Sequence, residues 1–187
     1  MAGTREEKKQ AVRTAIYETA IELFERDGYD AVSVGRITAE VGVAKGTFFN
    51  HFPVKADILA AWYSDLVGAA MSPPDPSLPL LDRLMALNRQ TRDLISRRPE
   101  LWRAKSIEAV RTPSLQAAER EADQAYVRAV TRELDCAEFR GDVGAMADLV
   151  LALTTGTWRE LRVTARLEEA EPLFRKRLEA LLGPKTT

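Results

Sequence analysis

The sequence predicts an all-α protein, because apolar residues recur at helical spacing along nearly the whole chain and strand-like alternation is hard to find. Glycines and prolines divide this pattern into pieces of helical length. The run 72–79 holds four of the nine prolines, so no helix can cross it and we expect a loop there. Together these observations predict about nine helices.

The first expected helix begins behind Thr4 and ends at Gly28. Thr4 and Glu7 fit a capping box, in which each side chain satisfies a backbone donor of the other residue. Gly28 suits a left-handed C-cap. The apolar residues that recur on one face between these ends are Val12, Ile16, Ala20, Leu23 and Phe24.

Two short helices and the start of a fourth helix follow. Ser33 suits the N-cap of the first short helix, which extends to Val41. Gly42-Val43 forms a turn, and the second short helix runs over 44–51. Pro53 then breaks the chain, and the fourth helix starts near residue 55.

Beyond the proline-rich loop, the apolar period predicts five further helices. Pro99 and Pro113 suit the first turn of two of them, where no amide donor is needed. The expected ranges are 80–97, 99–110, 113–134, 143–165 and 170–182. We therefore divide the chain into an N-terminal domain, residues 1–54, and a larger helical body, residues 55–187.

Composition excludes several classes of protein. The 27 Lys and Arg residues against 28 Asp and Glu residues give a net charge of −1, which is not that of a strongly basic nucleic-acid coat. The single cysteine, Cys136, and the single histidine, His51, provide neither a disulfide nor a His-rich metal site. No catalytic constellation stands out, so we expect neither enzymatic activity nor a cofactor. Without a secretory signal or a membrane-length apolar run, we expect a cytoplasmic protein with no membrane partner.

The two short helices have the pattern of a helix-turn-helix. They are too short to be stable alone, so we expect them to pack on the first helix and to leave one face of the second short helix free. That face is small, polar and slightly basic, which suits the major groove of DNA, and residues 41–55 contain no acid. Phe49 suits either the groove or the core. The candidate DNA contacts are Ser33, Arg36, Thr38, Ala44, Lys45, Gly46, Thr47, Phe49, Asn50, His51 and, as a phosphate clamp, Lys55.

Residues 11–59 resemble, in order and without gaps, the DNA-binding domain of TetR-type (TetR/AcrR) transcriptional regulators. The resemblance is carried by the segments IYETAIELFERDGY over 16–29, SVGRI over 33–37, VGVAKGTFFNHF over 41–52 and KAD over 55–57. It implies that residues 44–51 are the recognition helix, and that each subunit of a homodimer joins a DNA-binding head to a body that binds an inducer. The family often has a tyrosine hydroxyl on phosphate at position 49 or 50, and some members place an arginine at position 35. Here Phe49, Asn50 and Gly35 stand there, and Arg36 is a possible replacement for the missing arginine.

The body offers candidate ligand contacts, although packing in the core is the more common role for each of these residues. Aromatic residues fall on several expected body helices, where they could line a cavity for an apolar or aromatic effector with one polar group. The candidate ligand residues are Trp62, Leu66, Asn88, Trp102, Tyr126, Thr154 and Trp158.

The last two expected helices are candidates for a dimer interface. The helix over 143–165 is apolar on more than one face, and such a helix needs two partners. The helix over 170–182 is amphipathic and would complete a four-helix interface across a two-fold axis. The candidate interface residues are Met146, Val150, Leu153, Thr157, Phe174, Leu178 and Leu181.

These observations lead to two interpretations. The first is a repressor that binds a pseudo-palindromic operator as a homodimer and is released by a small hydrophobic or aromatic effector. The alternative is a helical protein that binds small molecules or partners and does not read DNA.

Overall fold

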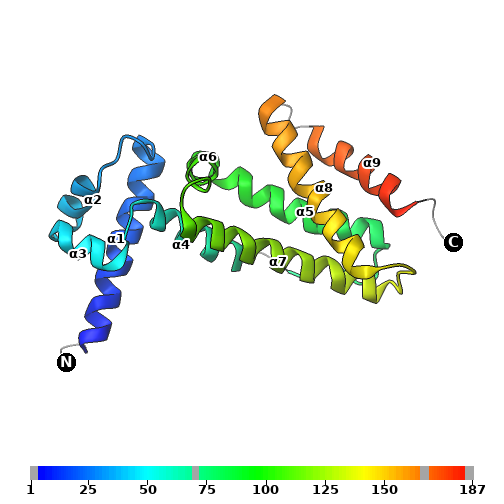
Figure 1. Cartoon of the computed structure of the whole chain (residues 1–187), viewed down its shortest axis with the longest axis horizontal. Helices are drawn as coiled ribbons and strands as arrows, with labels where there is room; N and C mark the ends of the chain where they lie inside the picture. The colour runs from blue at the N-terminus through cyan, green and yellow to red at the C-terminus, as the bar shows by residue number, and fades with distance from the viewer. Residues whose placement is uncertain (1–3, 69–71, 165–168, 184–187) are drawn as a thin grey trace. The chain divides into compact units, whose positions relative to one another are not determined.

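A computed structural model describes residues 4–68, 72–164 and 169–183. In this part of the chain the regular elements are helices, and no strand occurs, as expected for an all-α protein (Figure 1). The helices are α1 (Arg5–Asp27), α2 (Val34–Val41), α3 (Lys45–His51), α4 (Ala56–Gly68), α5 (Leu80–Arg97), α6 (Pro99–Glu108), α7 (Pro113–Cys136), α8 (Val143–Thr164) and α9 (Ala170–Leu182).

The helix ends agree with the expected signals in most places. The capping box at the start of α1 is confirmed, since Glu7 donates its amide to the Thr4 hydroxyl and the Glu7 carboxylate accepts from the Thr4 amide. Gly42 adopts the left-handed conformation, with φ 77° and ψ 33°. Gly28 has a positive φ of 85°, but its ψ of 144° is extended, so the predicted left-handed cap is only half right.

The helices form two compact units, which we describe separately. The first unit comprises Met1–Leu66 with Ile95–Glu119, and the second comprises Val67–Leu94 with Arg120–Thr187. Packing therefore places most of α4 and all of α6 with the three N-terminal helices. The functional division after residue 54 stays a prediction.

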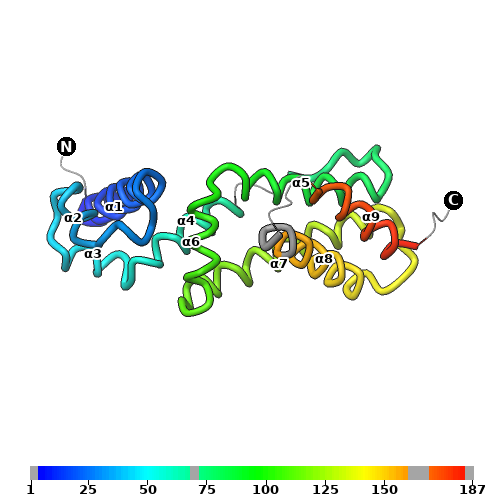
Figure 2. The backbone as a smooth tube through the Cα atoms, turned by 90° about the horizontal axis from the view of Figure 1, so that it is seen from above, coloured from blue at the N-terminus to red at the C-terminus, as the bar shows by residue number. Residues whose placement is uncertain are grey.

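In the first unit, α2 and α3 pack on α1 (Figures 1 and 2). Because α1 carries its apolar residues one helical turn apart, they form a single buried stripe that both short helices can cover. The side chains that close this core are all less than 3% exposed: Ile16, Ala20, Leu23, Phe24, Val32, Ile37, Phe48, Phe52, Ile58 and Leu59. Val41 and Val43, at the turn between α2 and α3, are half-buried.

In the second unit, one core joins α5, α7, α8 and α9, and α8 packs along α9 (Figure 1). Its fully buried members include Leu84, Val130, Val150, Phe174 and Leu178. The same core contains a buried ion pair, in which Arg83 Nη1 lies 3.2 Å from Glu133 Oε2. Each side chain of this pair is only 5% exposed, so each charge depends on the other for its stability.

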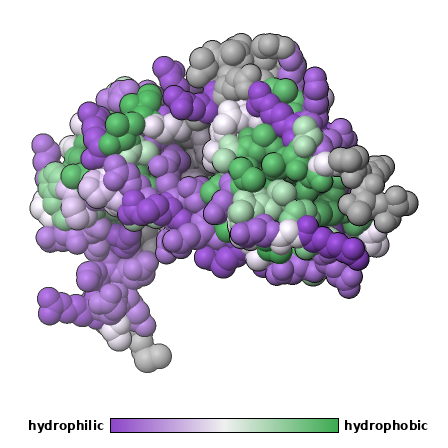
Figure 3. Space-filling view, turned by 45° about the vertical axis from the view of Figure 1, so that its right-hand side comes forward, coloured by the Kyte–Doolittle hydropathy of each residue, from purple (hydrophilic) through white to green (hydrophobic). Residues whose placement is uncertain are grey.

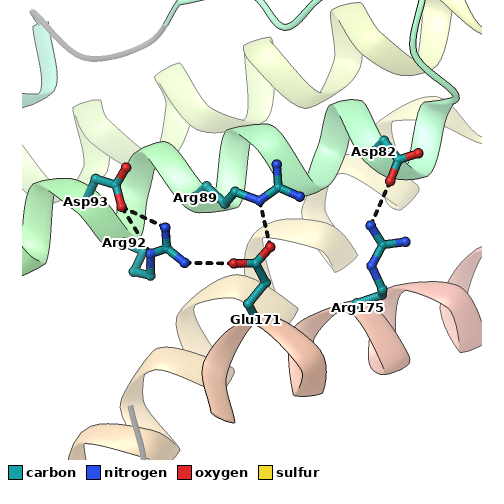
Figure 4. A network of polar contacts seen from close by, with 6 residues as sticks. All are labelled: Asp82, Arg89, Arg92, Asp93, Glu171 and Arg175. Atoms are coloured by element: carbon teal, nitrogen blue, oxygen red, sulfur yellow. Dashed lines mark hydrogen bonds and ion pairs between the residues drawn. The ribbon is translucent and has the colours of Figure 1, made fainter. Parts of the chain in front are cut away.

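A second, more exposed set of ion pairs ties α5 to α9 (Figure 4). The Glu171 carboxylate accepts from Arg89 Nε at 2.7 Å and from Arg92 Nη1 at 2.8 Å. One turn further along α9, Arg175 donates to Asp82 Oδ1 at 2.7 Å. Hydrogen bonding from Arg89 is the main reason why the pKa of Glu171 lies below its ordinary value.

Candidate nucleic-acid interface

Two interactions hold the short helix α3 in place: apolar packing on its buried side, and a hydrogen bond from one arginine at its C-terminal end. Phe48 is fully buried and contacts Phe52, which is 1% exposed. Arg13, on α1, donates from Nη1 to the His51 carbonyl at 2.6 Å, and its guanidinium stacks 4.2 Å from the Phe52 ring centroid. This arginine was not among the predicted site residues, because a long-range contact from α1 to the end of α3 leaves no local signal. Its role is to position α3, since it satisfies a carbonyl that the end of a helix leaves without a partner.

The face of α3 that we predicted to be free is exposed in the structure. Lys45, Gly46, Phe49 and Asn50 are exposed, as is the N-cap residue Ala44. Phe49 is 49% exposed although it touches Phe48 edge-on, so this phenyl ring belongs to the outer face and not to the core. Two further members of the predicted face, Thr47 and His51, are half-buried.

The glycine at position 35 has a packing consequence for Lys45. A Cβ atom added to Gly35 would lie 3.0 Å from Lys45 Cε and 3.4 Å from Lys45 Nζ, so the lysine side chain passes directly over the glycine. The absence of a side chain on α2 therefore gives Lys45 its path across the two short helices. Arg36, the possible replacement for an arginine at position 35, points to α1 and pairs with Asp27 at 2.8 Å.

The two hydroxyl residues predicted on α2 have different surroundings. Ser33 is exposed, and its Oγ caps α2 by accepting from the Arg36 amide at 3.1 Å. Thr38 is only 3% exposed, and its hydroxyl donates to the Gly35 carbonyl at 3.1 Å. A direct phosphate contact by Thr38 is therefore not supported, because its hydroxyl is satisfied inside the unit.

Lys55 also differs from the expected phosphate clamp. Its ammonium donates to the carbonyls of Tyr29 at 2.8 Å and Val32 at 3.0 Å, and it lies 3.9 Å from the centroid of the Tyr29 ring. Burial lowers the pKa of this lysine, and it is half-buried. In this structure Lys55 ties the loop between α1 and α2 to the start of α4. Its neighbours come from 23 and 26 residues earlier in the chain, which is why the sequence did not show this role.

The single histidine, His51, contributes a hydrogen-bond donor to the surface around α3, and its neutral form is favoured over its charged form. Partial burial lowers the pKa of His51, and the positive charges of Arg13 and Lys9 lower it further. The imidazole is therefore neutral over a wider pH range than a free one, and it can still donate one N–H to a phosphate.

The predicted ligand residues fall into two groups, one in each unit. In the first unit, Trp62 and Trp102 meet edge to face with ring centroids 6.3 Å apart, and Leu66 is half-buried. The ammonium of Lys105, itself 4% exposed, lies 5.1 Å from the Trp102 ring centroid and pairs with Glu119. Sequence reasoning missed this buried lysine, because an isolated lysine in a helix normally lies at the surface.

The second group, Tyr126, Thr154, Asn88 and Trp158, consists of buried residues of the second unit. Tyr126 and Thr154 are hydrogen-bonded through their hydroxyls at 2.9 Å, and burial raises the pKa of Tyr126 to about 12. Asn88 is 2% exposed and Trp158 is 6% exposed. The Asn88 amide nitrogen and the Trp158 indole nitrogen are buried without an acceptor among the described residues. Buried donors normally have acceptors, so each of these two nitrogens leaves a hydrogen bond unmade.

Four of the seven predicted interface residues lie inside the second unit. Val150, Phe174 and Leu178 are 0% exposed and Thr157 is 1% exposed, so these side chains support α8 and α9 from within and do not meet a partner. Met146, Leu153 and Leu181 are half-buried and remain candidates. The outer side of α8 carries residues that we did not name, among them Leu149, which is 50% exposed.

Comparison with known proteins identifies the first four helices. Residues 16–62 match the family model described as bacterial regulatory proteins, tetR family. An HTH-type transcriptional regulator of Staphylococcus aureus is 38% identical over 53 residues, which cover 27% of this chain and 29% of that protein. The sequence match therefore spans less than a third of the relative's length, and it concerns the DNA-binding segment.

Solved structures extend the likeness of fold to nearly the whole chain. A TetR-family regulator from Syntrophomonas wolfei has a TM-score of 0.68 at 20% identity, over 95% of this chain and 98% of that one. A regulator from Saccharomonospora viridis in complex with choline gives 0.62 at 22%, over 91% and 96%. FadR from Bacillus subtilis in complex with stearoyl-CoA gives 0.63 at 18%, over 91% and 97%.

We also searched the described residues for membrane-spanning helices and for metal sites. Among them, no helix combines the length and the apolar character needed to cross a bilayer. Within the same residues, no three His, Cys, Asp or Glu side chains come together in a group that could hold a metal ion.

Proposed function

We propose that this chain is a transcriptional regulator of the tetR family, whose model matches residues 16–62, and that it represses transcription by binding a pseudo-palindromic operator as a homodimer. A small effector that binds the body releases the operator. The protein acts in the cytoplasm, and neither catalysis nor a cofactor is part of this function.

The observation that carries the proposal is the exposed face of α3. A helix of 7 residues cannot hold its shape alone, yet Phe48 and Arg13 fix both its underside and its end. Its outer residues Lys45, Phe49 and Asn50 are exposed, and the segment 41–55 contains no acidic residue that would repel phosphates. A lysine and an asparagine suit base edges in the major groove, and Phe49 suits the methyl group of thymine.

The homodimer that we propose uses the outer side of α8 and α9. Figure 3 shows hydrophobic residues gathered over these helices, and the exposed or half-buried apolar ones include Met146, Leu149, Leu153 and Leu181. A second copy of the chain covers this surface across a two-fold axis. Two copies of α3 then meet two operator half-sites, whose separation equals about one turn of DNA, roughly 34 Å, or a multiple of it.

The effector site that we propose lies in the second unit, which contains two buried donors without a partner, the Asn88 amide nitrogen and the Trp158 indole nitrogen. Two donors without an acceptor favour a ligand that carries a carbonyl or another acceptor on an apolar body. Two of the structural neighbours were solved with small ligands, choline in one and stearoyl-CoA in the other, which supports a ligand-binding role for this fold. Release of DNA requires that the ligand binds one conformation of the dimer more tightly than the other.

A mobility-shift experiment with the DNA upstream of the chain's own gene tests the proposal. Lys45→Ala and Thr47→Ala should each weaken specific binding by about 1–3 kcal/mol if these side chains meet base edges. Arg120→Ala is the matched control, because Arg120 is exposed on α7 and outside the α3 face. Far-ultraviolet circular dichroism should be the same for all three variants.

The outcome separates the proposal from its alternative. Loss of binding in the α3 variants, together with wild-type binding by Arg120→Ala, supports a protein that reads DNA through α3. Failure of the wild-type chain to bind its own upstream DNA or any other DNA in a random-sequence selection would favour a helical binding protein that does not read DNA.

A further inference from the structure

A cavity of about 210 Å³ lies in the second unit between α5, α7 and the chain segment that precedes α5. Its apolar walls are Leu87 on α5 and Ala125 and Ala129 on α7. Leu87 and Ala129 are 1% and 5% exposed, so the floor belongs to the core of the unit. Drug-sized ligands occupy pockets of about 300–1,000 Å³, so this cavity suits a smaller molecule.

The outer wall of the cavity is held in place by hydrogen bonds. Ser72 lines the cavity and is tied to α5 by Gln90. The Ser72 amide donates to Gln90 Oε1 at 3.2 Å, and Gln90 Nε2 donates to the Ser72 carbonyl at 3.0 Å. The two bonds fix the backbone of the wall against the helix, so the cavity exists before a ligand arrives.

Two arginines, Arg128 and Arg132, line the same cavity from consecutive turns of α7. Like charges at positions i and i+4 of a helix repel each other, which costs stability. Gln124 and Cys136, the residues four positions before and after the pair, are not acidic, and Asp135, three positions after Arg132, forms no ion pair with it; no ion pair of either arginine exists among the described residues. Both side chains are exposed, so their guanidinium groups are open to a ligand.

The arginines of the neighbouring helices show the opposite pattern. Arg83 pairs with Glu133, Arg89 pairs with Glu171, and Arg175 pairs with Asp82 (Figure 4). Among the described residues, Arg128 and Arg132 have no such carboxylate partner, a condition that they share with the exposed Arg120 of the same helix, but only Arg128 and Arg132 border the cavity. An anion from solution is the partner that this arrangement lacks.

We propose that the cavity binds a small organic carboxylate with an apolar, aromatic-sized body. The carboxylate oxygens accept from the guanidinium groups of Arg128 and Arg132, a geometry in which arginine binds two oxygens at once. The body of the ligand lies against Leu87, Ala125 and Ala129. This site is separate from the buried donors of Asn88 and Trp158, and its use as an effector site rests on the proposed function.

Titration calorimetry on the full-length protein without DNA tests the site, with benzoate as the probe. We expect benzoate to bind. Benzyl alcohol, which lacks the carboxylate, and inorganic phosphate, which lacks the apolar ring, should each bind at least about tenfold more weakly. The double variant Arg128→Gln/Arg132→Gln should lose at least about tenfold in benzoate affinity. Arg120→Gln removes the same charge from the same helix outside the cavity and should leave the affinity unchanged.

A second variant keeps both charges and fills the space. Ala125→Leu should weaken benzoate binding about as much as the double variant does, while circular dichroism and the melting temperature show that the fold is kept. Benzoate affinity that is unchanged in the double variant, or phosphate binding as tight as benzoate binding, would overturn the proposal. Because the titration contains no DNA, its failure leaves the proposed operator binding untested and is distinct from a failure of the mobility shift.

Discussion

The short helix α3 and the helix α8 show how differently the pattern of apolar residues determines which face of a helix is buried. In α3, the structure buries Phe48 and leaves Lys45, Asn50 and the neighbouring Phe49 exposed, so the outer side is polar apart from one phenyl ring. In α8, apolar residues occur on two sides, and the structure buries Val150 while it exposes Leu149 next to it. A helix with one apolar face buries that face. A helix with two apolar faces can bury either one, and its own sequence does not determine which.

We expect the largest difference in folding stability between substitutions of two leucines in the second unit, one buried and one exposed. Leu178→Glu places a carboxylate at a position that is 0% exposed and should destabilise the fold by more than about 4 kcal/mol. Leu149→Glu places the same charge at a position that is 50% exposed and should change the stability by less than about 0.5 kcal/mol. Urea unfolding followed by circular dichroism measures both.

The same pair of variants tests the proposed dimer. Leu149→Glu should stay folded and sediment as a monomer under conditions in which the wild-type chain is a dimer. A folded Leu149→Glu variant with the wild-type dimer affinity would place the interface elsewhere on the molecule.

Two neighbouring phenylalanines make the corresponding comparison in α3. Phe48→Ala removes a ring that is 0% exposed and should cost about 3–5 kcal/mol of stability. Phe49→Ala should cost less than about 0.5 kcal/mol, because its ring is 49% exposed, and should weaken operator binding instead. Equal losses of stability in the two variants would show that α3 is rotated about its axis relative to the face described above.

Ion pairs of the second unit provide a third comparison, between a buried and an exposed carboxylate. Glu133→Gln leaves the buried Arg83 guanidinium without its counter-charge and should cost about 3 kcal/mol. Glu171→Gln should cost less than about 1 kcal/mol, because the Glu171 side chain is 36% exposed and water screens its contacts with Arg89 and Arg92. The difference in urea midpoint between the two variants measures this contrast, and similar midpoints would contradict it.

The smallest expected effects concern pH. Hydrogen bonds from Arg89 lower the pKa of Glu171, so its contribution is present above pH 4.5, its ordinary value, and is lost as the pH falls through the folded value. Burial lowers the pKa of His51, so the folded chain holds this proton less tightly, and stability is lost as the pH falls below 6.5.

Melting temperatures measured between pH 3 and pH 8 check both signs. Glu171→Gln should flatten the curve at its acid end, and His51→Gln should flatten it just below neutral pH. A stability that rises as the pH falls from 7 to 5 in the wild-type chain, and not in His51→Gln, would reverse the sign that we expect for the histidine.

Several features were predictable from the sequence because they depend on residues close together in the chain. The capping box of Thr4 and Glu7 spans one helical turn, and the left-handed turn at Gly42 needs only a residue without a side chain. The exposure of Lys45, Gly46 and Asn50 on α3 followed from the apolar position of Phe48, whereas the sequence left open whether Phe49 lies outside or in the core. The sequence alone therefore determined the all-α fold class, the two short helices and the outer face of α3.

Other features depended on contacts between residues far apart in the chain, which only the tertiary structure could decide. Lys55 binds carbonyls from the loop before α2, and Thr38 is turned inward, so both residues make hydrogen bonds within the unit that the sequence did not predict. On α8, the positions of α5, α7 and α9 determine that Val150 is buried and Leu149 is exposed. Local sequence sets which residues share a helical face, but the free energy of burial selects the face that turns inward only when the other helices are in place.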